Sequence, residues 1–147
     1  MPSAAASLRG RRTVAERVRL PRQMREAMLA HAVAGLPLEA CGIVIGRGGE
    51  PLRFVPTANA AASPTRYEID PRDLLRVTLD IEAADEAIWG IFHSHPTSAA
   101  YPSATDIRLA FYPEAVYLIV SLMDPGRPDL RGFRIVDGQV AEVGLEP

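Results

Sequence analysis

Two histidines, a serine and an aspartate lie close together in the second half of the chain. The segment His93-Ser94-His95-Pro96 is followed by Ser103 and Asp106, so these groups fall within fourteen residues. Imidazole nitrogens and carboxylate oxygens are ligands that Zn²⁺ takes, and three protein ligands with an open fourth position are typical of a catalytic zinc site. His93, His95 and Asp106 are therefore candidate zinc ligands.

The elements around these residues must bring them together. The apolar run 88–92 predicts a central strand that ends at the histidines. Side chains at positions i and i+2 of a strand share a face, so His93 and His95 would aim at one point if the strand continues through them. We expect a loop over 96–102 and a short helix over 103–110, whose first turn would return Asp106 to the same point.

The rest of the chain predicts further strands and two long helices. In the first helix, Pro21 fits the first helical position, and Met24, Met28, Ala32 and Val33 form an apolar stripe. In the second, Asp70 is the expected cap and Pro71 the first helical residue. Helices are expected at 21–35 and 70–87, and strands at 14–20, 41–45, 52–55, 66–69, 88–92, 115–122, 130–136 and 139–143. This pattern predicts an α/β (α+β) fold with a mainly antiparallel sheet, two long helices and one short helix.

Length and composition fit one globular domain. The chain has 147 residues, of which 48% are hydrophobic and 23% charged, with a net charge of −2. All 16 basic residues are arginines, and no basic stripe with interleaved aromatic residues occurs, so we predict no nucleic-acid binding. No apolar run approaches the length of a membrane span. We expect a mobile tail over 1–12 and the domain over 13–147.

The single cysteine, Cys41, cannot form an internal disulfide, so a reducing, cytoplasmic location is expected. In the first twelve residues a weakly apolar stretch precedes the basic residues, the reverse of a secretory signal. Cys41 lies in an apolar run, which favours a buried, inert thiol over the nucleophile of a Cys–His hydrolase.

The polar residues also allow plainer interpretations. Ser103-Ala104-Thr105-Asp106 is a helix-capping pattern, and taken alone it favours a cap over a metal site. Glu39, just before the first buried strand, could be a solvated acid. In a hydrolase, the same carboxylate could accept a proton from water and pass it to the leaving amine, and Ser103 could donate a hydrogen bond to the oxyanion.

Taken together, the five positions resemble the JAMM signature of the MPN (Mov34/JAB) metalloproteases. Glu39 precedes the two histidines, seven residues separate His95 from Ser103, and two separate Ser103 from Asp106. The resemblance implies one Zn²⁺ per chain held by His93, His95 and Asp106, with Glu39 as general acid/base and Ser103 as oxyanion donor. It also implies a single MPN/JAB-like (cytidine-deaminase-like) domain.

Other segments resemble the bacterial branch of the family, over roughly residues 14–143. They are His31-Ala32, Pro37 to Gly42, Asn59-Ala60, Ser63-Pro64-Thr65, Tyr67, Ala100 to Ser103 and Arg134 to Gly138. The resemblance implies cleavage of a peptide or isopeptide bond at the C-terminus of a small ubiquitin-like sulfur-carrier protein, with release of cysteine from a carrier–cysteine adduct as the expected reaction. The chain lacks the long insertions of eukaryotic members, which favours a small bacterial carrier.

Two further alternatives concern the class of protein. Scaffold members of this fold are non-catalytic interaction modules that lack one or more of the Glu, His, His and Asp set, whereas this chain keeps all four. A structural zinc site normally has four protein ligands, often cysteines, and only Cys41 is present. Both observations favour an enzyme. The sequence does not predict its oligomeric state.

Overall fold

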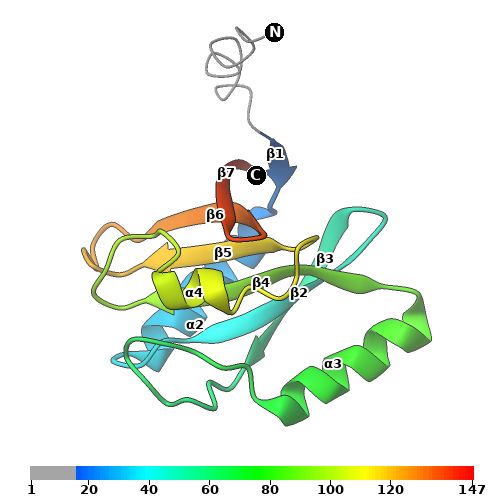
Figure 1. Ribbon diagram of the computed structural model, residues 1–147, viewed down its shortest axis with the longest axis horizontal. Helices are drawn as coiled ribbons and strands as arrows, with labels where there is room; N and C mark the ends of the chain where they lie inside the picture. The colour runs from blue at the N-terminus through cyan, green and yellow to red at the C-terminus, as the bar shows by residue number, and fades with distance from the viewer. Residues whose placement is uncertain (1–15) are drawn as a thin grey trace, which may run out of the picture.

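A seven-stranded sheet forms the centre of the protein (Figure 1). The computed structural model describes residues 16–147. Its strands are β1 (Arg17–Arg19), β2 (Cys41–Arg47), β3 (Glu50–Thr57), β4 (Ala87–His95), β5 (Val116–Ser121), β6 (Asp129–Val136) and β7 (Gln139–Glu146). Its helices are α2 (Arg22–Gly35), α3 (Pro71–Ala84) and α4 (Ala104–Arg108). The strand order is β1-β7-β6-β5-β4-β2-β3. Of the six neighbouring pairs, only β1·β7 and β4·β5 are parallel, so the predicted mainly antiparallel sheet is confirmed.

The two faces of the sheet are covered by different helices. On one face, α2 buries Met24, Met28 and Ala32 against residues such as Val44, Phe92 and Leu118. On the other face, Val77 of α3 and Ile107 of α4 belong to a cluster that contains Ile43, Ile91, Ile119 and Phe133. Because alternate strand residues point to opposite faces, the odd-numbered positions of β4 from Ile91 onward, like Ile43 of β2 and Ile119 of β5, face α3 and α4. His93 and His95 belong to this second set.

Strand β4 lies inside the sheet and extends through both histidines. It pairs with β2 on one side, in antiparallel register with Cys41 opposite His93, and with β5 on the other, where His95 is opposite Ser121. The short helix α4 lies in the crossover between the parallel strands β4 and β5. The prediction that the strand would continue through His93 and His95 is confirmed.

Several local predictions are confirmed by the backbone. Asp70 caps α3, because its side chain accepts a hydrogen bond from the Arg72 N–H, and Pro71 is the first helical residue. Between the strands expected at 130–136 and 139–143, Asp137 and Gly138 both have positive φ angles, as a two-residue hairpin turn requires.

Other predictions about the elements are wrong in detail. Pro21 is the N-cap of α2 with an extended ψ of 143°, so the helix begins one residue later than expected. Val33 is 54% exposed, because a helix lying on a flat sheet buries only a narrow stripe. The expected strand over 66–69 is an irregular loop with a single bridge between Asn59 and Ile69, since side-chain hydrogen bonds replace a ladder there.

The second long helix ends at Ala84 rather than at 87, since Asp85 adopts a left-handed conformation that reverses the chain into β4. The expected tail over 1–12, and the first two residues of the strand expected at 14–20, lie outside the described residues. Within residues 16–147, no helix combines the length and apolar character that crossing a bilayer requires.

The packing of α2 on the sheet predicts the effect of a core truncation. Met28 has no exposed surface, so Met28→Ala should lower the free energy of unfolding by about 2–5 kcal/mol through lost burial and a residual cavity. Met123, which is 61% exposed, is the matched control. Met123→Ala should change the free energy of unfolding by less than about 0.5 kcal/mol. Urea denaturation followed by Trp89 fluorescence measures both. Equal effects of the two substitutions would contradict this packing.

Candidate active site

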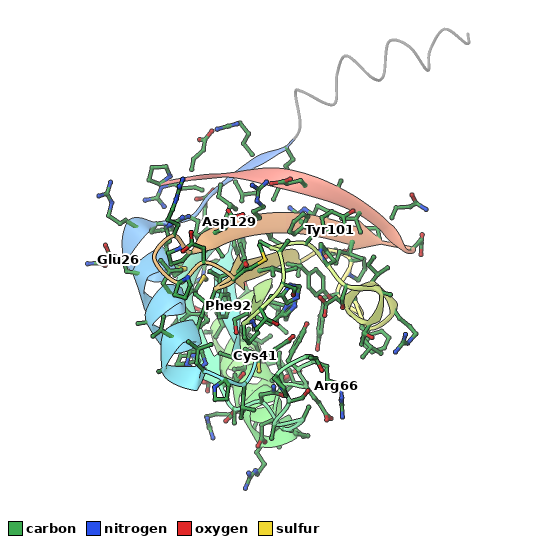
Figure 2. The ribbon with its side chains drawn as sticks, turned by 90° about the vertical axis from the view of Figure 1, so that its left-hand side faces the viewer. Glu26, Cys41, Arg66, Phe92, Tyr101 and Asp129 are labelled. Atoms are coloured by element: carbon green, nitrogen blue, oxygen red, sulfur yellow. The ribbon has the colours of Figure 1, made fainter. Side chains whose placement is uncertain are left out.

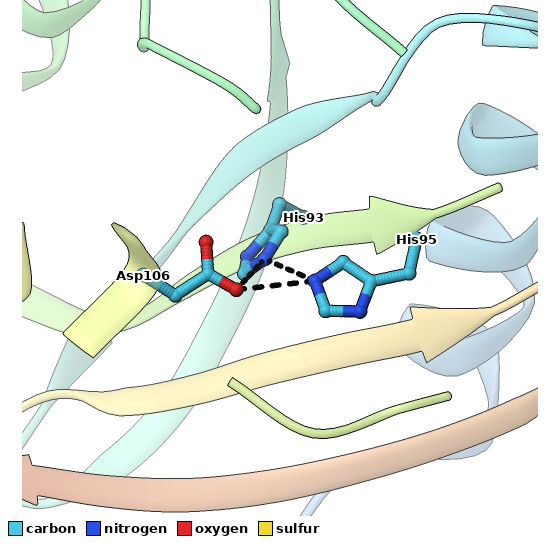
Figure 3. A group of neighbouring side chains, drawn as sticks. All are labelled: His93, His95 and Asp106. Atoms are coloured by element: carbon cyan, nitrogen blue, oxygen red, sulfur yellow. Dashed lines mark hydrogen bonds and ion pairs between the residues drawn. The ribbon is translucent and has the colours of Figure 1, made fainter. Parts of the chain in front are cut away.

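The three predicted ligands converge at the end of β4 (Figure 3). Nε2 of His93 lies 3.1 Å from Nε2 of His95, and each lies 3.1 Å from Oδ2 of Asp106. All three side chains are buried, with at most 9% of each residue exposed. The strand delivers the two imidazoles to one face, and α4 delivers the carboxylate from its first turn. The predicted cluster is therefore formed by the fold.

The donor set fits a divalent metal ion such as Zn²⁺. Ligand atoms at about 2.0–2.2 Å from a tetrahedral zinc lie about 3.3–3.6 Å from one another, close to the triangle of 3.1 Å separations. Nδ1 of His95 donates to the carbonyl oxygen of Ala99 at 2.7 Å. In the neutral ring this tautomer leaves the Nε2 lone pair directed at the other two atoms, as in metal-ligating histidines.

Asp106 is positioned by the helix cap. The Ser103 hydroxyl oxygen accepts from the Asp106 N–H at 3.0 Å, and Oδ2 of Asp106 accepts from the Ser103 N–H at 2.9 Å. The expected capping pattern is thus present, and the same carboxylate oxygen faces both histidines. The two interpretations of this segment are compatible. Because the Ser103 hydroxyl accepts in the cap, its own hydrogen stays available for donation.

Glu39 reaches the cluster through strand pairing. The register that places Cys41 opposite His93 continues with a bond from the Ser94 N–H to the Ala40 carbonyl oxygen at 3.0 Å, so Glu39 falls opposite His95. Glu39 is only 4% exposed, and its buried Oε1 has no hydrogen-bond partner. The solvated acid that the sequence also allowed is therefore excluded.

Burial governs the ionisation of these groups. It raises the pKa of Glu39 to about 8; the charge of His95 opposes the increase and that of Asp106 adds to it. Burial also opposes ionisation of Asp106, yet hydrogen bonds from His93 and from the protonated ring of His95 hold its pKa well below the usual range. Burial lowers the pKa of His93. For His95, bonds to Asp106 and Ala99 outweigh burial and raise the pKa.

Tyr67 forms one wall of the site. Its ring stacks on the imidazole of His93, with centroids 4.3 Å apart and an interplanar angle of 20°. Nδ1 of His93 is buried without a hydrogen-bond partner, so this stack takes the orienting role that a hydrogen bond has for His95. The sequence points to Tyr67 only through the family resemblance, since nothing in its neighbourhood indicates that its ring packs on His93.

A groove of about 410 Å³ runs from Asp106 between α4 and the loop that carries Tyr67. Its wall includes Leu109 and Phe111, which are 44% and 72% exposed, and Arg66. The groove is mainly apolar, and Asp106 is the member of the ligand cluster that lines it. Another hollow, of about 460 Å³, lies between α2 and the end of β7 and contains none of the predicted site residues.

Cys41 is buried and inert. It has no exposed surface, and burial raises the pKa of its thiol to about 11, the opposite of what a nucleophilic thiolate needs. Its Sγ lies 3.4 Å from Oγ1 of Thr57. Figure 2 shows Cys41 and Phe92 in the interior and Arg66 toward the outside. The interpretation of Cys41 as the nucleophile of a Cys–His hydrolase is therefore wrong.

Comparison with protein families agrees with this geometry. A family model described as prokaryotic homologs of the JAB domain matches residues 21–136. The chain belongs to this family. The match covers α2 through β6 and includes all five predicted site residues. It confirms the predicted JAB/MPN-like fold class.

Several named relatives of the chain are peptidases. The CysO-cysteine peptidase of Mycobacterium tuberculosis is 48% identical over 118 residues, which cover 79% of this chain and 81% of the relative. A probable TtuB-protein conjugate cleaving protease of Thermus thermophilus is 35% identical, over 86% of this chain and 80% of the relative. The solution structure of a protein from Desulfitobacterium hafniense is 40% identical and superposes with a TM-score of 0.77, covering 88% of this chain and 92% of the other. The two named peptidases confirm the expectation of a peptidase.

The buried Glu39 predicts a pH-dependent stability. Because its pKa is raised in the folded state, the folded protein binds this proton more tightly than the unfolded chain, and the free energy of unfolding falls as pH rises from about 4.5 through about 8. Glu39→Gln removes this dependence. In chelator-treated protein, the variant should gain about 1–4 kcal/mol over the unsubstituted protein between pH 5 and pH 9.

Thermal or urea unfolding at each pH measures the difference. Glu50→Gln, the same substitution at an exposed residue of β3, serves as the control and should follow the unsubstituted protein. Parallel pH profiles for Glu39→Gln and the unsubstituted protein would contradict burial of an ionisable Glu39.

Proposed function

We propose that this protein is a zinc-dependent hydrolase that cleaves a peptide or isopeptide bond at the C-terminus of a small ubiquitin-like sulfur-carrier protein. The observation that carries the proposal is the convergence of His93, His95 and Asp106 beside the buried carboxylate of Glu39. The relative from Mycobacterium tuberculosis is named a CysO-cysteine peptidase, and this name supports release of cysteine from a carrier–cysteine adduct as the reaction.

Each site residue has a distinct chemical role. When held by His93, His95 and Asp106, Zn²⁺ would supply Lewis-acid activation of a water molecule. Glu39, whose pKa burial raises to about 8, in its ionised form accepts the proton of the attacking water and delivers it to the leaving amine nitrogen. Ser103, whose hydroxyl hydrogen is left free by the cap, donates to the oxygen that becomes negative as the carbonyl carbon turns tetrahedral.

The shape of the site suits a thin, extended substrate. The groove beside Asp106 is mainly apolar, so apolar side chains of a carrier tail can bind against Leu109 and Phe111. The non-catalytic scaffold alternative gives no reason to bury an unpartnered Glu39 carboxyl oxygen beside three converging ligands, because an uncompensated buried polar group costs stability.

The decisive experiment separates metal binding from proton transfer. Glu39→Gln should keep about one zinc per chain but lose at least about 100-fold in kcat, the usual contribution of a general acid/base. Asp106→Asn keeps an oxygen for the cap but removes the charge, so it should lose most of its zinc. Elemental analysis, and mass spectrometry of a carrier–cysteine adduct, measure the two effects.

The exposed Glu50→Gln variant should match the unsubstituted protein in both assays. Full turnover by Glu39→Gln would remove Glu39 from the mechanism, and normal zinc content in Asp106→Asn would leave Asp106 only its capping role. Undiminished turnover by metal-free protein would reject the proposed function.

The groove predicts a separate effect on substrate binding. Phe111→Ser should raise KM for the carrier adduct about tenfold or more, because burying an aromatic side chain against the tail stabilises the complex by about 1.5–3 kcal/mol. It should leave kcat within about twofold. Leu75→Ser, on the exposed face of α3 outside the groove, is the matched control. Equal KM values in both variants would show that the tail binds elsewhere.

A further inference from the structure

The Glu39 carboxylate depends on its backbone for position. Its buried Oε1 has no hydrogen-bond partner, so no hydrogen bond fixes that oxygen. The main chain of this residue is held on both sides. The Glu39 N–H donates to the Ser63 carbonyl oxygen at 2.9 Å, and the Glu39 carbonyl oxygen accepts from Nδ2 of Asn59 at 3.0 Å.

Asn59 uses its whole hydrogen-bonding capacity around this point. Besides Glu39, its Nδ2 donates to the Arg66 carbonyl oxygen at 3.1 Å. Its Oδ1 accepts from the N–H groups of Ala61 and Glu68 at 3.0 and 2.9 Å. A side-chain amide has two N–H donors and two acceptor lone pairs, so every one is paired. All four partners are backbone groups, and they belong to two separate segments of the chain.

The partners of Asn59 also enclose Tyr67. The Arg66 carbonyl and the Glu68 N–H lie on either side of this residue in the chain, and its ring stacks on His93. One amide therefore links the backbone of the proposed acid/base to the loop whose aromatic ring forms the opposite wall of the site. Two backbone bonds also join the ends of this loop, from the Ala60 N–H to the Glu68 carbonyl oxygen and from the Asp70 N–H to the Ala58 carbonyl oxygen, but neither of them reaches Glu39.

We infer that Asn59 is a positioning residue, which holds the Glu39 backbone and the Tyr67 loop in the geometry that proton transfer requires. The inference rests on the proposed function, since it assigns Asn59 a role in that same reaction. Asn59 acts through Glu39 and does not itself exchange protons. A displacement of about 1 Å in a reacting group can cost on the order of 100-fold in rate, so loss of this link should appear mainly in kcat.

Two substitutions test the link. Asn59→Asp keeps the shape and the acceptor oxygen but replaces both donors with an acceptor facing the carbonyls of Glu39 and Arg66, and Asn59→Ala removes all four bonds. At saturating Zn²⁺, each should lower kcat about 10–100-fold and leave KM within about twofold. Thr65→Val is the control: it removes the contact with the Ser63 hydroxyl in the same loop and should change neither constant.

A double-mutant cycle distinguishes positioning from general damage. If Asn59 acts through Glu39, then Asn59→Ala should change the residual rate of Glu39→Gln by less than about threefold, although it costs 10–100-fold in the unsubstituted protein. The inference would be overturned if the double variant lost rate by the product of the two single effects. A full rate in both Asn59 variants would also overturn it, because the link would then contribute nothing.

Amide hydrogen exchange provides a readout that needs no substrate. In Asn59→Ala, the amides of Glu39, Ala61 and Glu68 should exchange at least about tenfold faster, while those of β5, on the far side of β4, should be unchanged. Unchanged exchange at Glu39 would overturn the inference even if the protein proves to have another activity. If the unsubstituted protein does not hydrolyse carrier adducts, faster exchange would still establish the structural link, and only the proposed function would fail.

Discussion

The register between β2 and β4 is the constraint on which the site depends. Cys41 lies opposite His93, and the pairing continues to Ala40 and Ser94, so Glu39 meets His95. Since strand side chains alternate between faces, a slip of one residue would turn both histidines toward α2 and separate them from Asp106. Such a slip would cost free energy, because it would displace buried apolar residues on both faces of these strands, such as Val44 and Ile91. Core packing thereby fixes the geometry of the polar groups.

The polar groups are unusual in their depth. A carboxyl group, two imidazoles and an aspartate are buried at the end of a central strand, where each needs a partner to offset its desolvation. The fold provides partners for some atoms, such as the Ala99 carbonyl for His95 and the Ser103 N–H for Asp106. It leaves Oε1 of Glu39 and Nδ1 of His93 without any. These two unpartnered atoms thus lower the stability of the fold at residues that are proposed to act in the reaction.

The sequence predicts the site better than it predicts its supports. The alternation of His93 and His95 on a strand and the capping pattern of Ser103 and Asp106 follow from local rules, and the structure confirms both. The role of Glu39 could be predicted only from the spacing of the whole motif, because strand register brings together residues that are far apart in the chain. The stack of Tyr67 on His93 was not predictable, since it depends on how a loop folds over the sheet.

Errors in the elements have similar causes. Val33 fits an apolar helical stripe, but the width of the stripe is set by the surface on which the helix packs. The segment 66–69 has strand-forming residues, yet the amide of Asn59 occupies backbone groups that a ladder would have used. In both cases tertiary contacts outweigh local preference.

The ligands and the acid differ in how the chain brings them together. His93 and Asp106 are only 13 positions apart and belong to one crossover, whereas Ala40 and Ser94, which align Glu39, are 54 positions apart. Closing the longer loop costs more conformational entropy, and contacts between residues distant in sequence slow folding more than local contacts do. The ligand triad therefore depends on one local crossover, whereas the proton acceptor depends on a pairing between strands far apart in the chain.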